Sequence, residues 1–246
     1  MDNEILIAQI SAFKSDSRRE FEKAVEALIS LAYRYRRLGE NFLWDADPSL
    51  ELEANEILRG LSDSLAEKAK ARALAIIRKE EWGWEDDAWE DANEREDEPL
   101  LTRLDQQASF LRELLEIWIA IAFVEGLSQS YLNILVIRYL SNPYASPLWK
   151  GLPANLLKHG PGYQRNIIDQ LALIGSDGIV NAVRLAEWMD AREKGAVYYI
   201  RRRGSFYRCD ECQSLANKPI PIEVPWDFTH ARCMCYPEYH YGPIEI

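Results

Sequence analysis

The residues best suited to chemistry in this chain are four cysteines and a histidine near its carboxyl end. All four cysteines of the 246-residue sequence lie between positions 209 and 235. They follow the spacing Cys-x2-Cys-x17-His-x2-Cys-x-Cys, and its members are Cys209, Cys212, His230, Cys233 and Cys235. Thiolates and imidazole in such clusters are typical zinc ligands. The pattern therefore predicts either a local metal site or a pair of disulfides.

We interpret this cysteine–histidine motif as a structural zinc site. The amino terminus is acidic and lacks the basic segment of a signal peptide, so we expect a protein that is not secreted and keeps its cysteines reduced. A closed zinc site takes four ligands, so five candidates leave one spare. The expected ligands are Cys209, Cys212, Cys233 and either His230 or Cys235. Disulfides and unligated thiols are the alternatives that the spacing leaves open.

The motif lacks the surroundings of a catalytic site. A redox Cys-x-x-Cys opens a helix in a βαβ unit, and a deaminase zinc site needs a His-x-Glu before the first cysteine; neither context precedes Cys209. The Gly-Pro-Gly stretch at 160–162 lacks the lysine of a phosphate-binding loop. His159, His230 and His240 stand in no catalytic pattern. We therefore predict that the chain is not an enzyme.

A run of arginines just before the first cysteine is the candidate surface for nucleic acid. Its members are Arg201, Arg202, Arg203 and Arg208. Arginine contacts phosphate, and the aromatic rings interleaved with this run could stack on bases. We expect a β-hairpin with strands at 196–200 and 206–207 and with the basic run at its tip. The alternative is a solvated hairpin whose aromatic side chains alternate into the core.

Helical patterns occupy most of the chain before the motif. Ser17 with Glu20 three residues later predicts a helix start, and Asp47-Pro48 predicts another, since aspartate caps the amino end and proline fits the first turn. The expected helices follow a short apolar stretch at 5–13 and cover 18–38, 48–77, 102–125, 131–140, 163–174 and 177–194. The fold class is therefore mainly α: a body of long antiparallel helices, then a small α+β segment with a β-hairpin and the Cys/His knuckle.

The expected domain boundary is a proline- and glycine-rich stretch at 143–162. It would separate a helical body (1–142) from a carboxyl-terminal part (163–246). The hydrophobic content of 48% is ordinary for a globular protein. The longest apolar run, 117–124, is too short to cross a bilayer, so we expect no membrane partner.

Residues 80–98 form an acidic segment with an unusual composition. They hold eleven acidic side chains and one basic one, or −10 of the total net charge of −11, so the rest of the chain is nearly neutral. Such charge predicts a solvated, mobile loop. Its three tryptophans, Trp82, Trp84 and Trp89, either tuck against the helical body or dock a partner.

The carboxyl-terminal motif resembles the end of the phage Mu F-like minor head proteins, the head-morphogenesis family of tailed phages. That family has a cysteine pair followed by Leu-x-Gly-Lys, and then a proline-rich approach to His-Pro-x-Cys-Arg-Cys. The matching residues are Cys209, Cys212, Leu215, Lys218, Pro225, His230, Cys233 and Cys235. Asn217 replaces the family's glycine, Ala231 its proline and Met234 its arginine. Asparagine also accepts the left-handed backbone that glycine adopts.

The resemblance implies a virion component present in few copies. Such a protein would sit with portal or capsid proteins, assist head assembly and accompany DNA during packaging or ejection. It would be found in the virion, and in the host bacterial cytoplasm during assembly. Two other interpretations compete with this one. The first is a zinc-knuckle nucleic-acid-binding or adaptor protein of a mobile element, and the second is a toxin or nuclease-like enzyme.

Overall fold

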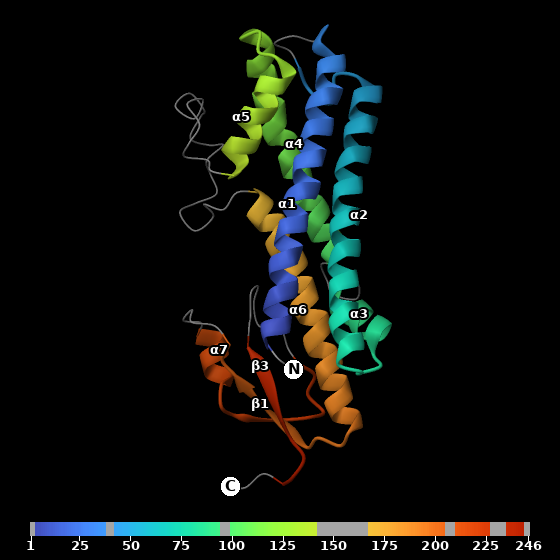
Figure 1. Ribbon diagram of the computed structural model, residues 1–246, viewed down its shortest axis with the longest axis vertical. Helices are drawn as coiled ribbons and strands as arrows, with labels where there is room; N and C mark the ends of the chain where they lie inside the picture. Colours follow the sequence, from blue (N-terminus) through green and yellow to red (C-terminus); the bar gives the residue numbers. More distant parts are fainter. Residues whose placement is uncertain are drawn as a thin grey trace. The chain divides into compact units, whose positions relative to one another are not determined.

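The computed structural model describes residues 3–37, 42–93, 99–141, 167–204, 210–226 and 235–243. Within these ranges the chain is mainly helical, with a small three-stranded antiparallel sheet near the carboxyl end (Figure 1). This confirms the predicted fold class. The elements are α1 (Asn3–Arg34), α2 (Pro48–Lys79), α3 (Glu85–Asn93), α4 (Leu100–Val124), α5 (Gln129–Ser141), α6 (Ile167–Glu193), β1 (Tyr198–Arg202), α7 (Asp210–Leu215), β2 (Pro219–Pro221) and β3 (Tyr236–His240).

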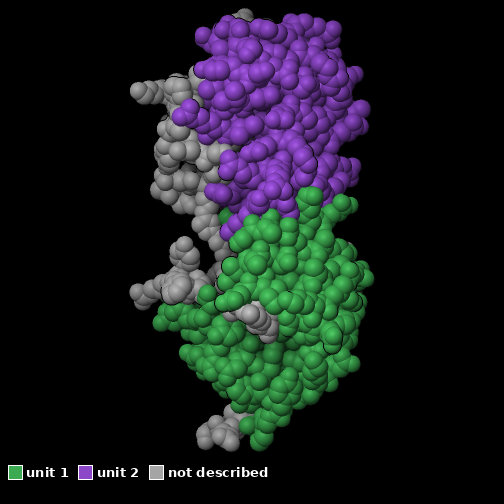
Figure 2. Space-filling model, viewed as in Figure 1, with its two compact units in different colours: residues 1–13, 67–100, 173–246 green, residues 14–66, 101–172 purple. Residues whose placement is uncertain are grey.

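The chain divides into two compact units that interleave along the sequence (Figure 2). Unit 1 comprises Met1–Phe13, Glu67–Leu100 and Leu173–Ile246, and unit 2 comprises Lys14–Ala66 and Leu101–Ala172. The expected connection at 143–162 lies outside the described residues. Each unit combines segments from both sides of that connection, so the units do not follow the linear division expected at 142 and 163.

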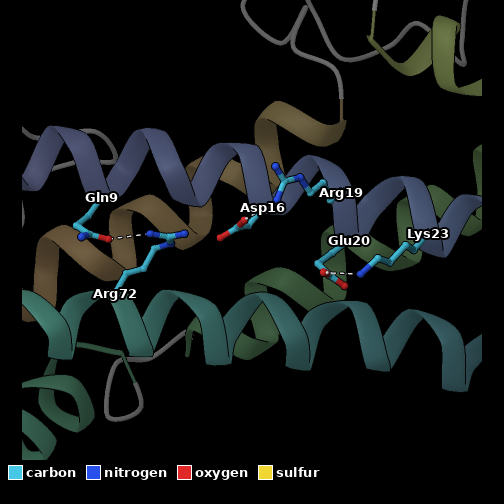
Figure 3. A network of polar contacts seen from close by, with 6 residues as sticks. All are labelled: Gln9, Asp16, Arg19, Glu20, Lys23 and Arg72. Atoms are coloured by element: carbon cyan, nitrogen blue, oxygen red, sulfur yellow. Dashed lines mark hydrogen bonds and ion pairs between the residues drawn. The ribbon is translucent and has the colours of Figure 1, made fainter.

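Helices α1 and α2 run antiparallel within each unit. In unit 1, Arg72 Nη1 of α2 donates to Gln9 Oε1 of α1 over 2.8 Å, and Figure 3 shows the two side chains pointing toward one another. In unit 2, Arg34 of α1 pairs with Glu53 of α2 at 2.6 Å. Arg37 and Asp47, just beyond the ends of the two helices, pair at 3.2 Å, so within unit 2 the number on the α2 side falls as the number on the α1 side rises, as in an antiparallel helical hairpin.

Helix α1 is one continuous helix rather than an apolar stretch followed by a helix that starts at Ser17. Ser17 is fully buried inside it. The buried positions Leu6, Phe13, Phe21 and Leu28 continue a single apolar stripe through this serine. Its hydroxyl is small enough to lie within that stripe, so tertiary packing overrides the local capping signal. Lys23 and Glu20, three residues apart on α1, form an ion pair at 3.0 Å (Figure 3).

The predicted start of α2 is confirmed. Asp47 Oδ1 accepts hydrogen bonds from the backbone N–H groups of Ser49 (2.9 Å) and Leu50 (3.4 Å), as an N-cap does. Gly126 and Gly195, the second residues after α4 and α6, have φ values of +68° and +84°, which confirms the predicted helix ends. These boundaries were predictable because capping chemistry is local.

Nine of the fourteen described residues of the acidic segment, 80–93, form helix α3, where a mobile loop was expected. Trp82 and Trp89 are 8% and 3% exposed, so these two tryptophans pack against the protein, which was one of the two alternatives for them. Asn93, at the end of α3, donates from Nδ2 to the carbonyl oxygen of Gly178 on α6 over 3.1 Å. The acidic side chains therefore lie on a helix whose tryptophan side belongs to the core of unit 1.

Helix α6 is continuous through residues 175–178, where two separate helices were expected. A methyl group at Gly175 would overlap the ring of Phe13 on α1. One at Gly178 would come within 2.8 Å of Asn93 Oδ1. The two glycines thus serve close helix packing inside unit 1, whereas the sequence alone suggests a break.

Candidate metal centre and its arginine neighbours

The elements that carry the cysteine–histidine motif meet on the small sheet. The strand order is β2-β1-β3, and both neighbours pair antiparallel with β1. Residues 198–200 pair with 219–221, and residues 198–202 pair with 236–240. Both edges of β1 are therefore paired with segments from later in the chain; residues 206–207, the expected second strand of the hairpin, lie outside the described residues.

Cys212 lies in helix α7 and is 3% exposed. The carbonyl oxygen of Cys212 accepts the N–H of Ala216 (2.9 Å), and Ala216 forms a β-bridge with Arg201. The next residue, Asn217, has φ of +61° and donates its N–H to the carbonyl oxygen of Arg201 over 3.1 Å. The left-handed backbone expected at Asn217 is confirmed. Cys212 is thus within one helical turn of the carboxyl end of β1.

Cys235 immediately precedes β3 and is 2% exposed. Its neighbour Tyr236 pairs with Arg202, the last residue of β1. Side chains alternate along a strand, so Cys235 faces the same side of the sheet as Pro237. Pro237 is the cross-strand partner of Arg201, so this is the side on which Arg201 lies. Through the bridge of Ala216 to Arg201 and the pairing of Tyr236 with Arg202, Cys212 and Cys235 belong to segments that meet at the carboxyl end of β1.

The other three candidate ligands, Cys209, His230 and Cys233, lie outside the described residues. Within the described ranges, no three Cys, His, Asp or Glu side chains gather in a way that could hold a metal ion. The two described cysteines fit a closed zinc site in their chemistry and in their burial. The complete ligand set stays a prediction.

Arg201 is not on an exposed tip, because its side chain is 1% exposed. Its Cζ lies 4.3 Å from the centre of the Trp226 ring, which is itself 4% exposed. A guanidinium stacked on a buried indole gains about 1–2 kcal/mol. Tyr199, two residues earlier on the same face, donates its hydroxyl to the Pro225 carbonyl oxygen over 3.3 Å. Both contacts hold residues 225–226, which precede His230 in the sequence, against β1.

Arg202 links two segments on the opposite face of the sheet. Its Nε donates to Glu238 Oε2 over 2.5 Å, and its Nη1 donates to Asn217 Oδ1 over 2.7 Å. The hydrogen bond from Arg202 lowers the pKa of Glu238, and His240 adds to this effect. The same bond raises the pKa of Arg202. This guanidinium is therefore committed to protein groups.

Three members of the predicted nucleic-acid surface, Arg201, Arg202 and Arg203, are among the described residues. Arg201 is buried and Arg202 is bonded to Glu238 and Asn217, which leaves Arg203 as the exposed arginine among those described. Arg208 lies outside the described residues. One exposed arginine is a weak electrostatic footprint for phosphate.

A buried polar cluster near β3 was not foreseen from the sequence. Arg184 and Glu187 of α6 form a 2.7 Å ion pair whose side chains are 1% and 9% exposed. Burial raises the pKa of the Tyr239 hydroxyl on β3, and the charge of Glu187 raises it further. The one available signal was the spacing of three between Arg184 and Glu187, which equally describes a solvated pair.

No helix in the described part of the chain combines the length and apolar character needed to cross a bilayer. Comparison with protein-family models, with curated proteins and with solved structures finds no match to this chain.

Proposed function

We propose that the chain is a minor capsid or head-morphogenesis protein of a tailed phage or prophage. It docks near the portal, assists head assembly or DNA packaging and ejection, and catalyses no reaction. The observation that carries this proposal is the motif from Cys209 to Cys235, which resembles the end of the Mu F-like minor head proteins. The left-handed Asn217, at the position of the family's glycine, supports the same local backbone.

We also propose that the motif holds one structural zinc ion. Four cysteines and a histidine provide the donors that zinc prefers, and a closed site with four protein ligands is structural rather than catalytic. Cys212 and Cys235 support this proposal because both are buried at one end of the same sheet. When bound, zinc would supply a fixed crosslink between the segments that carry Cys212 and Cys235.

A nucleic-acid-binding role for the arginine run is less well supported. Arg201 and Arg202 are held by Trp226, Glu238 and Asn217, and would have to leave these partners to reach phosphate. The helical body suits docking between proteins, because it offers long helices and the net negative charge of the chain is concentrated in the acidic segment.

Deletion of the gene from the phage or prophage that carries it tests the proposed function. We expect induced cells to yield fewer filled heads, and the wild-type chain supplied in trans to restore them. The Cys209→Ser variant should restore them poorly. Normal yields of filled, infectious heads without the chain would overturn the proposal. Salt-sensitive retention of the chain on DNA, lost on replacing Arg201–Arg203 with alanine, would instead favour the nucleic-acid alternative.

A further inference from the structure

The end of β1 contacts three described residues within or next to the cysteine–histidine motif. Asn217 follows the first cysteine pair, Trp226 precedes His230, and Glu238 follows the last cysteine. Arg202 bonds to the first and third of these, and Arg201 stacks on the second. The guanidiniums of Arg201 and Arg202 thus contact both described segments that contain a cysteine of the motif, residues 210–226 and 235–243.

The two arginines act on opposite faces of the sheet. Arg201 shares the buried face with Tyr199, and the alternation of side chains puts Arg202 on the other face with Glu238. The planar guanidinium of Arg202 presents several N–H groups in fixed directions, so it can bond to Glu238 and Asn217 together. A lysine would present its donors from a compact ammonium on a flexible stem, so it would hold the two partners in a less fixed arrangement.

We propose that Arg201 and Arg202 are positioning residues that preorganise the cysteine–histidine motif for zinc. This inference rests on the zinc site proposed above. Metal binding is strongest when the ligand-bearing segments are already ordered, because the ordering cost is then met during folding. Interactions outside the ligand shell commonly tune metal affinity in this way. The arginine run is therefore part of the support of the metal site.

Arg202→Ala tests the proposal, since this side chain is partly exposed and its loss leaves the core of unit 1 intact. We expect the zinc dissociation constant, measured by competition with a chromophoric chelator, to rise by less than the roughly 10–100-fold that follows the loss of a residue bonded directly to a metal ligand. Lys194→Ala is the matched control, because Lys194 forms a comparable exposed ion pair with Asp190 (2.8 Å) elsewhere in unit 1. Its zinc affinity should equal that of the wild type. Arg202→Lys should fall between the wild type and Arg202→Ala.

Asn217→Gly provides a second variant if Arg202→Ala folds poorly. Glycine accepts the φ of +61°, so this change removes the bond to Arg202 and keeps the backbone. Asn217→Gly should also weaken zinc binding. The loss of zinc affinity in the double variant, Arg202→Ala with Asn217→Gly, should be smaller than the sum of the losses in the two single variants. The visible spectrum of the cobalt-substituted protein should be the same in all variants, because the ligands are unchanged.

The outcomes separate this inference from the proposal on which it rests. A wild-type chain that binds no zinc when fully reduced would overturn both the zinc site and the positioning role. Zinc binding with equal affinity in the wild type, Arg202→Ala and Asn217→Gly would overturn the positioning role alone. In the metal-free protein, hydrogen exchange of residues 217–226 and 236–240 should be faster in Arg202→Ala than in Lys194→Ala.

Discussion

Glycines set how closely the helices of unit 1 approach one another. Gly175→Ala should lower the free energy of unfolding by about 1–3 kcal/mol, because the new methyl group overlaps the buried ring of Phe13. Gly60→Ala is the matched control, since Gly60 lies in α2 with no neighbouring atom within 4 Å of the added carbon. That change should stabilise the chain by up to about 1 kcal/mol. Chemical denaturation measures both, and equal effects of the two changes would contradict the packing role of Gly175.

Glu238 should make the sheet sensitive to acid. Arg202 lowers the pKa of Glu238 in the folded state below the usual value of about 4.3. In the pH range between these two pKa values, the unfolded chain binds more protons than the folded chain. Stability from this pair is full above about pH 5 and is lost as the pH falls through the folded pKa. The stability difference between the wild type and Glu238→Gln should therefore shrink on acidification. Carboxyl groups titrate between about pH 3 and 6. If the stability difference between the two proteins stays constant over this range, the link between Glu238 and acid sensitivity is contradicted.

At the scale of elements, α3 joins the acidic segment to the core. Trp89→Ala should cost about 3–5 kcal/mol of unfolding free energy, because Trp89 is 3% exposed and its loss leaves a cavity. Asp87→Asn, an exposed change on the same helix, should shift it by less than about 0.5 kcal/mol. Urea denaturation followed by circular dichroism decides this. A mild effect of Trp89→Ala would show that α3 is a surface appendage.

Helix boundaries set by local chemistry could be predicted, whereas those set by distant contacts could not. Asp47 marks the start of α2 because its carboxylate caps nearby N–H groups. Ser17 and Gly175 carry equally good local signals, but their burial within α1 and α6 outweighs those signals. The pairing of β1 was also beyond local reasoning, since its partners at 219–221 and 236–240 come from later in the chain and include three prolines.

The candidate site was predictable in its composition and not in its support. The spacing of cysteines and histidine is a local feature, and it singled out Cys212 and Cys235 before any geometry was known. The role of Arg201 depends on which face of β1 is buried, and on Trp226 lying beneath it. The arginine run therefore predicted phosphate binding from its charge alone, whereas in the structure Arg201 is buried inside the protein.

At the scale of the whole molecule, the zinc site should stabilise one region of the chain. We predict about one zinc per chain in protein purified under reducing conditions, measured by elemental analysis. In Cys209→Ser, hydrogen exchange should accelerate from residue 198 onward, with helices α1 to α5 as protected as in the wild type. Fully reduced, folded protein without metal would contradict the zinc site. A uniform loss of protection would contradict its local action.

The most direct test of the central claim is quantitative mass spectrometry of purified heads from the induced phage or prophage. The amount of this chain, quantified from its peptides relative to the major capsid protein, should correspond to a few copies per head. The same amount should remain after loosely bound protein is removed. Full, infectious particles that contain none of the chain would contradict the assignment to the phage head.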